Sequence, residues 1–153
     1  MKPPCARRLA PLLCLLAGCL EKTSAPPPAP VVQRPATPTF HADIAPKFEL
    51  HCALPSCHGT PQSKMVSLDL RAAFSYRELV NHLSEGRTGA VRVKPGDPSQ
   101  SFLVDKLTGS LARGEGKGMP IDASTGTSMS PNPLAEWTET KLMPWIAAGA
   151  PDN

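Results

Sequence analysis

The sequence lacks an apolar run long enough to cross a bilayer. A transmembrane helix needs about 20 apolar residues, whereas the run from Leu9 to Leu16 is short and contains Pro11. No stretch alternates apolar and polar residues in the manner of a half-buried strand. No nucleophile is recognisably paired with a general base. These absences predict an all-α protein that is not an enzyme.

An excess of one charge is also missing once the first 18 residues are set aside. The chain has 16 Lys and Arg against 13 Asp and Glu, and Lys2, Arg7 and Arg8 account for the whole difference. The remaining chain is electrically balanced with histidines neutral. This balance gives no support for a nucleic-acid partner.

The first 18 residues have the order of an export signal: a positive start, an apolar section, then small residues. The end of this section, Leu16-Ala17-Gly18-Cys19, resembles the lipobox of bacterial lipoproteins. The resemblance implies a signal peptide over 1–18 and a lipidated Cys19, with an ordinary secretory signal as the alternative. Leu20 after the cysteine favours the outer membrane by the same resemblance, so we expect the periplasm or cell envelope.

Proline is abundant directly after this leader. Residues 19–39 are expected to form a Pro-rich linker, and its extended proline segments would span roughly 60 Å at most. The remaining segment, residues 40–153, is long enough for one domain. Such a linker would hold a domain away from a membrane surface.

Four short helices are expected in this domain. Their segments are 40–52, 75–83, 98–109 and 138–150, with Asp43, Ser75, Asp97 and Thr138 as expected caps and Gly109 as a stop. The first should bury Phe40, Ile44 and Phe48; the second, Tyr76, Leu79, Val80 and Leu83; the third, Phe102, Leu103 and Leu107; the last, Leu142, Trp145 and Ile146. Pro144 should kink the last helix. Arg71 and Arg92 are expected at the surface, although either could pair with an anionic group of a cofactor.

Apolar mass for a core is scarce. The whole chain has seven aromatic residues, and residues 109–133 form one long Gly- and Ser-rich stretch. Loops of this length in a compact domain are usually functional or disordered. Short helices with few aromatics and long loops predict that a bound cofactor supplies part of the centre.

The segment "HCALPSCHGT" contains the only cysteines of residues 40–153, Cys52 and Cys57, followed by His58. Three chemistries fit. A Cys52–Cys57 disulfide would close a very small loop and leave His58 unexplained. A zinc site would need a further ligand from His41, His51 or His82.

The third chemistry is covalent haem, for which Cys-x-x-Cys-His is the attachment signature. Here the spacer has four residues, so the extra ones, near Leu54 and Pro55, must bulge outward. A sixth ligand could come from Met119 in "GKGMPID", since a methionine in a glycine-rich loop has no helical face to pack on. Met129 is the reserve candidate, and Met65 and Met143 are poorer ones.

The ordered motifs "F-x-x-D-I-x-P-x-F", "C-H-G", "L-D-L", "V-K-P-G-D-P", "G-M-P" and "W-I-x-x-G-A" resemble the bacterial planctomycete-type cytochrome c domain. The resemblance covers residues 40–150. It implies a cytochrome c-like fold and one haem c bound covalently through Cys52 and Cys57. His58 would be the proximal iron ligand and Met119 the distal one.

The expected function is that of a monohaem c-type cytochrome lipoprotein. It would pass single electrons between redox proteins of the cell envelope while its lipid holds it to a membrane. One alternative is a haem-free binding or structural module with a Cys52–Cys57 disulfide. A second is a haem enzyme or sensor whose sixth iron position is open, in which case Met119 would not be a ligand.

Overall fold

The computed structural model describes residues 36–59 and 67–153, which lie in one compact unit. The expected signal peptide, Cys19, most of the linker and Met65 lie outside the described residues. The described part is helical, with isolated β-bridges but no strand, so the all-α prediction is confirmed for it. None of its helices is long and apolar enough to cross a membrane. Its α-helices are α1 (Ala45–His51), α2 (Ala72–Leu79), α3 (Phe102–Thr108), α4 (Ala135–Trp137) and α5 (Met143–Ala147).

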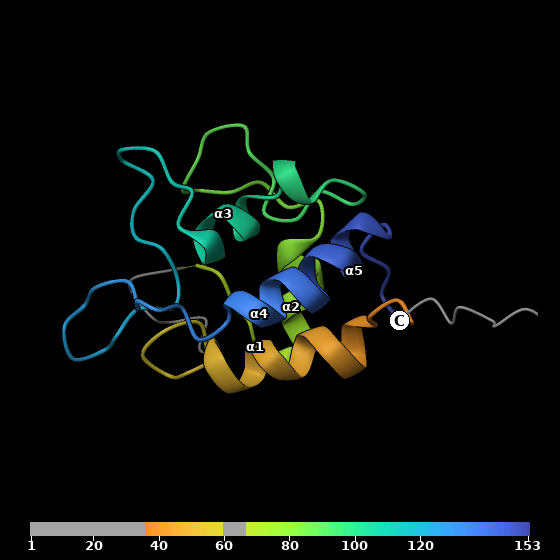
Figure 1. Ribbon diagram of the computed structural model, residues 1–153, viewed down its shortest axis with the longest axis horizontal. Helices are drawn as coiled ribbons and strands as arrows, with labels where there is room; N and C mark the ends of the chain where they lie inside the picture. The colour runs from red at the N-terminus through yellow and green to blue at the C-terminus, as the bar shows by residue number, and fades with distance from the viewer. Residues whose placement is uncertain (1–35, 60–66) are drawn as a thin grey trace, which may run out of the picture. The chain divides into compact units, whose positions relative to one another are not determined.

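Three further helical turns extend these elements. The π-helix η1 (Phe40–Ile44) runs directly into α1, and the π-helix η3 (Thr138–Leu142) joins α4 to α5. The 3-10 helix η2 (Pro98–Gln100) precedes α3. The described part of the chain therefore has four helical segments, as the sequence predicts (Figure 1).

Each π turn is followed, after one intervening residue, by a proline. The last bond of η1 runs from the Ala45 N–H to the Phe40 carbonyl, and that of η3 from the Met143 N–H to the Thr138 carbonyl. Pro46 and Pro144 follow one residue later. Because a proline cannot donate to the carbonyl four residues back and its ring collides with it, a wider preceding turn relieves the contact. The irregularity expected at Pro144 takes this form.

The centre of the fold is a cluster of aromatic rings. Phe40 lies 5.1 Å from Tyr76 and 5.4 Å from Trp145 between ring centroids. The Trp145 side chain is 0 % exposed, and its indole N–H donates to the Pro151 carbonyl at 2.9 Å. The expected burial of Phe40, Ile44, Phe48, Leu142, Trp145 and Ile146 is confirmed.

Three expected caps are wrong. Ser75 lies inside α2, buried, because the helix begins at Ala72, whose N–H is bound by the Glu49 carboxylate of α1 at 2.7 Å. Thr138 lies inside the last helical segment, and its hydroxyl donates to the Leu134 carbonyl. Asp43 lies in the first turn of η1, where its carboxylate accepts the Thr39 N–H.

The second expected helix is also displaced toward the N-terminus. It ends at Leu79, where residue 80 turns to an extended conformation. Leu83, expected to be buried on this helix, is therefore 63 % exposed. The contact with Glu49 of α1 accounts for the start of α2, which the capping pattern of the local sequence does not indicate.

The segment around α3 agrees with the prediction in its cap and its stop, but the single helix expected over 98–109 is interrupted at Ser101, which is extended between η2 and α3. The Asp97 carboxylate accepts the Gln100 N–H before η2, and Pro98 occupies the first position. Gly109 ends α3 at φ 78°, a left-handed conformation that favours glycine. Phe102 and Leu107 are buried, and Leu103 packs against the core while partly exposed.

The long loops leave the helices on one side in Figure 1. The segment after α1, in yellow, and the segments between α3 and α4, in teal and blue, project to the left of the view. These loops carry Cys57, His58 and Met119.

Candidate functional site

The loop after α1 folds back on itself. The His58 N–H donates to the Cys52 carbonyl at 3.1 Å, and the Cys57 N–H donates to the Leu54 carbonyl at 2.8 Å. Residues 54–56 are exposed. The four-residue spacer thus bulges into solvent, and the backbone at Cys52 meets the backbone at His58.

Gly59 is required by this loop. A Cβ at residue 59 would lie 2.2 Å from the Ala53 carbonyl oxygen and 2.9 Å from the Leu54 carbonyl carbon. Both neighbours are backbone atoms and cannot swing away. The glycine after the histidine is therefore explained by the close approach of residues 53 and 54.

The two cysteines lie close enough to interact electrostatically. Burial, and secondarily the neighbouring Cys57, raises the pKa of Cys52 to about 12. Cys52 also packs against the hydrophobic core. Its sulfur is therefore a protonated thiol at neutral pH, and the structure does not join it to Cys57 in a disulfide.

The His58 ring is oriented by a main-chain carbonyl. Its Nδ1 lies 3.1 Å from the Leu68 oxygen, and a carbonyl can only accept, so Nδ1 carries the hydrogen. The lone pair is then on Nε2, the arrangement found in metal-bound histidines. Burial lowers the pKa of His58 more than the hydrogen bond to the Leu68 carbonyl raises it, and the positive charges of Arg92 and Lys106 lower it further. The imidazole is thereby kept neutral and able to bind a metal.

Met119 is held by its main chain. Its N–H donates to the Lys106 carbonyl of α3 at 2.7 Å, and its half-buried side chain packs against the hydrophobic core. Met129 lies in the same long loop, where its N–H donates to the Pro120 carbonyl, but its side chain is 40 % exposed. Met143 packs against the core from α5. Of the described methionines, Met119 alone combines a loop position with packing against the core.

The histidines considered as zinc ligands do not form a common site. His41 pairs with Asp152 at 3.2 Å on the surface, and His82 is exposed. His51 ends α1. Across residues 36–59 and 67–153, no group of three or more His, Cys, Asp or Glu side chains could hold a metal ion.

Arg92, which the sequence placed at the surface, is buried in the structure. It is 7 % exposed, and its guanidinium donates to the Glu78 carbonyl at 2.7 Å and lies 3.5 Å from the Glu78 carboxylate. Isolated basic residues carry no periodic signal, so the sequence could not place it. Arg71 is partly exposed and forms a bidentate pair with Asp69.

Arg87 and Lys106 hold the loop between α3 and Met119 through ion pairs and hydrogen bonds. The Arg87 guanidinium binds both Glu115 oxygens, at 2.5 and 2.7 Å, and Asp105 at 2.6 Å. The Lys106 ammonium donates to the Glu115 carbonyl at 2.6 Å and to the Lys117 carbonyl at 3.1 Å. No motif or spacing in the sequence had indicated a role for any of these residues.

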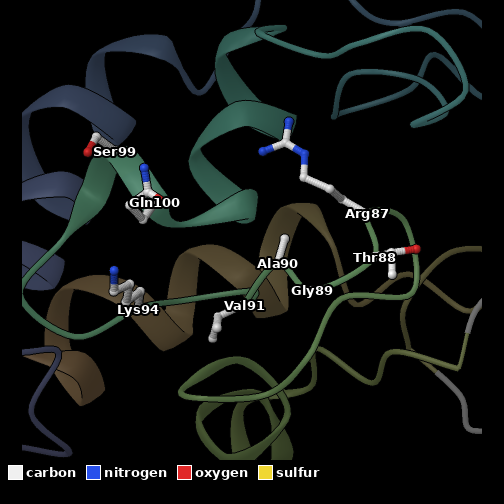
Figure 2. A pocket seen from close by; sticks show the side chains of 8 residues that line it. All are labelled: Arg87, Thr88, Gly89, Ala90, Val91, Lys94, Ser99 and Gln100. Carbon is white, nitrogen blue, oxygen red and sulfur yellow. The ribbon is translucent and has the colours of Figure 1, made fainter.

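A surface hollow of about 360 Å³ is bounded by residues 87–91, 94, 99 and 100. Figure 2 shows the Arg87 guanidinium extending toward α3, where Asp105 holds it. None of the candidate cysteines, His58 or Met119 lines this hollow. It is therefore separate from the candidate site.

Comparisons with protein-family models, curated proteins and solved structures found no match. The chemistry of the site must then be inferred from its donors. Two neighbouring thiols, an imidazole with its Nε2 lone pair available, and a thioether on a core-packed loop are the groups that haem c uses. The residues present fit that cofactor.

Proposed function

We propose that this protein is a monohaem c-type cytochrome with a cytochrome c-like fold. It carries single electrons between redox proteins of the cell envelope and is held by lipid on Cys19, in the outer membrane. It is an electron carrier rather than an enzyme. Support comes from the order of its sequence motifs, from the all-α architecture and from the donor set just described.

One observation carries the proposal. The hydrogen bond from Nδ1 of His58 to the Leu68 carbonyl leaves Nε2 as the basic nitrogen, directly after a cysteine. A solvent-facing histidine would have no need of this orientation, and a disulfide would not explain it. A metal ligand commonly has it, because a histidine that binds a metal through one ring nitrogen usually donates the hydrogen of the other to a carbonyl or carboxylate.

Each residue then has a defined task. Cys52 and Cys57 would anchor haem c through thioether bonds, and His58 and Met119 would bind its iron. When bound, the haem supplies an iron that exchanges one electron at a time. The chain orients the imidazole through Leu68, keeps it neutral by burial, and shields it from water with the core that Cys52 and Met119 contact. No proton acceptor is needed.

The proposal is tested by producing the chain together with haem-maturation machinery. We expect a red protein whose haem survives acid–acetone extraction and whose mass exceeds that of the polypeptide by one haem. Cys57→Ala should lose a thioether bond and His58→Ala should alter the spectrum. Leu54→Ala, a change at a side chain 46 % exposed in the same loop, is the matched control and should leave both properties intact.

A colourless wild-type protein from the same cells would contradict the proposal. If its mass were instead lower by two hydrogens, the disulfide-containing module would replace it. A haem protein whose spectrum is unchanged in Met119→Ala would support the enzyme or sensor alternative, because the methionine would then not be a ligand.

A further inference from the structure

Asn132 links three separate pieces of main chain. Its Nδ2 donates to the Leu107 carbonyl at 2.5 Å and to the Met119 carbonyl at 2.9 Å. Its Oδ1 accepts the Leu134 N–H at 2.8 Å. Both hydrogens of the amide and its oxygen are therefore used.

These bonds exploit the end of a helix. The last carbonyls of an α-helix have no partner within it. In α3, the Lys106 carbonyl accepts the Met119 N–H and the Leu107 carbonyl accepts the Asn132 amide. The N–H and the C=O of Met119 are consequently both tied to the same helix end, one directly and one through Asn132.

Asn132 is itself firmly placed. It is half-buried, and Leu134, whose N–H it accepts, is 2 % exposed and begins the segment that leads into α4. The Asn132 side chain thus ties the main chain of Met119 to the packed helices rather than to the surrounding loop. Thirteen residues separate Asn132 from Met119, so only the folded chain brings them together.

We propose that Asn132 is a positioning residue that fixes the place of the Met119 thioether relative to His58. The proposal rests on the proposed function, in which Met119 is the distal ligand. Asn132 does not touch the cofactor; it acts through the main chain of Met119. Loss of its donors should let Met119 leave its place while the chain stays folded.

The test compares Asn132→Asp and Asn132→Ala with Met119→Ala and Asn153→Ala in the haem-loaded protein. Asn132→Asp keeps the shape but places a carboxylate against two carbonyls. Asn153→Ala is the matched control, because the Asn153 side chain also accepts a main-chain N–H, but that of Phe40 at the start of η1. The readouts are the charge-transfer band of thioether-ligated ferric haem, the reduction potential, and hydrogen exchange at the Met119 amide.

We expect each Asn132 variant to weaken thioether ligation roughly tenfold, because each loses the two hydrogen bonds that the amide donates to the Leu107 and Met119 carbonyls. The band should decrease, the potential should fall toward that of Met119→Ala, and the Met119 amide should exchange faster. Asn153→Ala should change none of these. Unchanged bands and exchange in both Asn132 variants, beside a lost band in Met119→Ala, would overturn the positioning role. An equal loss in Asn153→Ala would also overturn it.

Failure of the proposed function would look different. A wild-type protein without haem, or a Met119→Ala variant with the wild-type spectrum, would remove the distal ligand itself. The inference would fall with it, before any Asn132 variant is considered.

Discussion

The aromatic side of the domain and its loop side are held together by different forces. Around Phe40 and Trp145 the contacts are between rings and aliphatic side chains that exclude water. Around Met119 they are hydrogen bonds to main-chain carbonyls, including those from Lys106, and the ion pairs of Arg87. The helices form a scaffold, and polar contacts fasten the loops that carry His58 and Met119 to it.

This division suits a site built on loops. Loops with little apolar surface cannot bury enough area to order themselves, so they need specific polar anchors. The C-terminal carbonyls of α3 provide such anchors. Damage to the aromatic side should therefore affect the whole fold, whereas damage to the loop side should affect the site first.

The largest effect is expected on the aromatic side. Trp145→Ala removes a fully buried indole that packs against Phe40 and Tyr76, and it should lower the free energy of unfolding by about 3–5 kcal/mol. Chemical denaturation of the haem-loaded protein, monitored by circular dichroism, measures this. Leu83→Ala, at a side chain 63 % exposed, should change it by less than about 0.5 kcal/mol. Similar losses in both would mean that the aromatic cluster is not the scaffold.

A smaller effect is expected on the loop side, where Gly59 packs against the main chain of residues 53 and 54. Gly59→Ala forces a methyl group against the Ala53 carbonyl and should cost about 1–3 kcal/mol, the usual range for overpacking. The yield of covalently attached haem should also fall, because the added methyl group forces the loop that carries Cys57 and His58 away from residues 53 and 54. Haem content per mole of chain, measured against Leu54→Ala, would reveal the difference. An unchanged yield would show that this loop tolerates distortion.

The smallest effect is expected from the solvent-accessible ion pair of the loop side. Hydrogen bonds from Arg87, and then from the Ala112 N–H, lower the pKa of Glu115 from 4.5 to about 2. The folded state therefore gains stability from this carboxylate above pH 4.5 and loses it as the pH falls toward 2. Glu115→Gln should show a shallower acid dependence of its denaturation midpoint than the wild type. Parallel curves would mean that the pair contributes nothing measurable.

The sequence predicted the apolar faces well and the helix starts poorly. The spacing of Phe40, Ile44 and Phe48 is a property of the local chain, and so is the left-handed stop at Gly109. The capping pattern at Ser75 was misleading, because the Glu49 carboxylate of a different helix binds the N–H of Ala72. Local patterns cannot anticipate a partner that arrives from elsewhere in the chain.

The candidate site divides in the same way. Cys52, Cys57, His58 and Met119 were identified from residue type and spacing. The carbonyl that orients His58, the backbone contact that demands Gly59 and the hydrogen bonds of Asn132 appeared only in the structure. Main-chain acceptors carry no side-chain signature, and for that reason the sequence could not reveal them.

The sequence by itself determined the helical class, the apolar faces and the kinds of atom available to a metal, because these depend on periodicity and on side-chain chemistry. Only the tertiary structure decided which nitrogen of His58 is free, how Met119 is held and where Arg92 is buried. Those outcomes depend on hydrogen bonds and packing between segments that lie far apart along the chain, and such contacts exist only once the helices have come together.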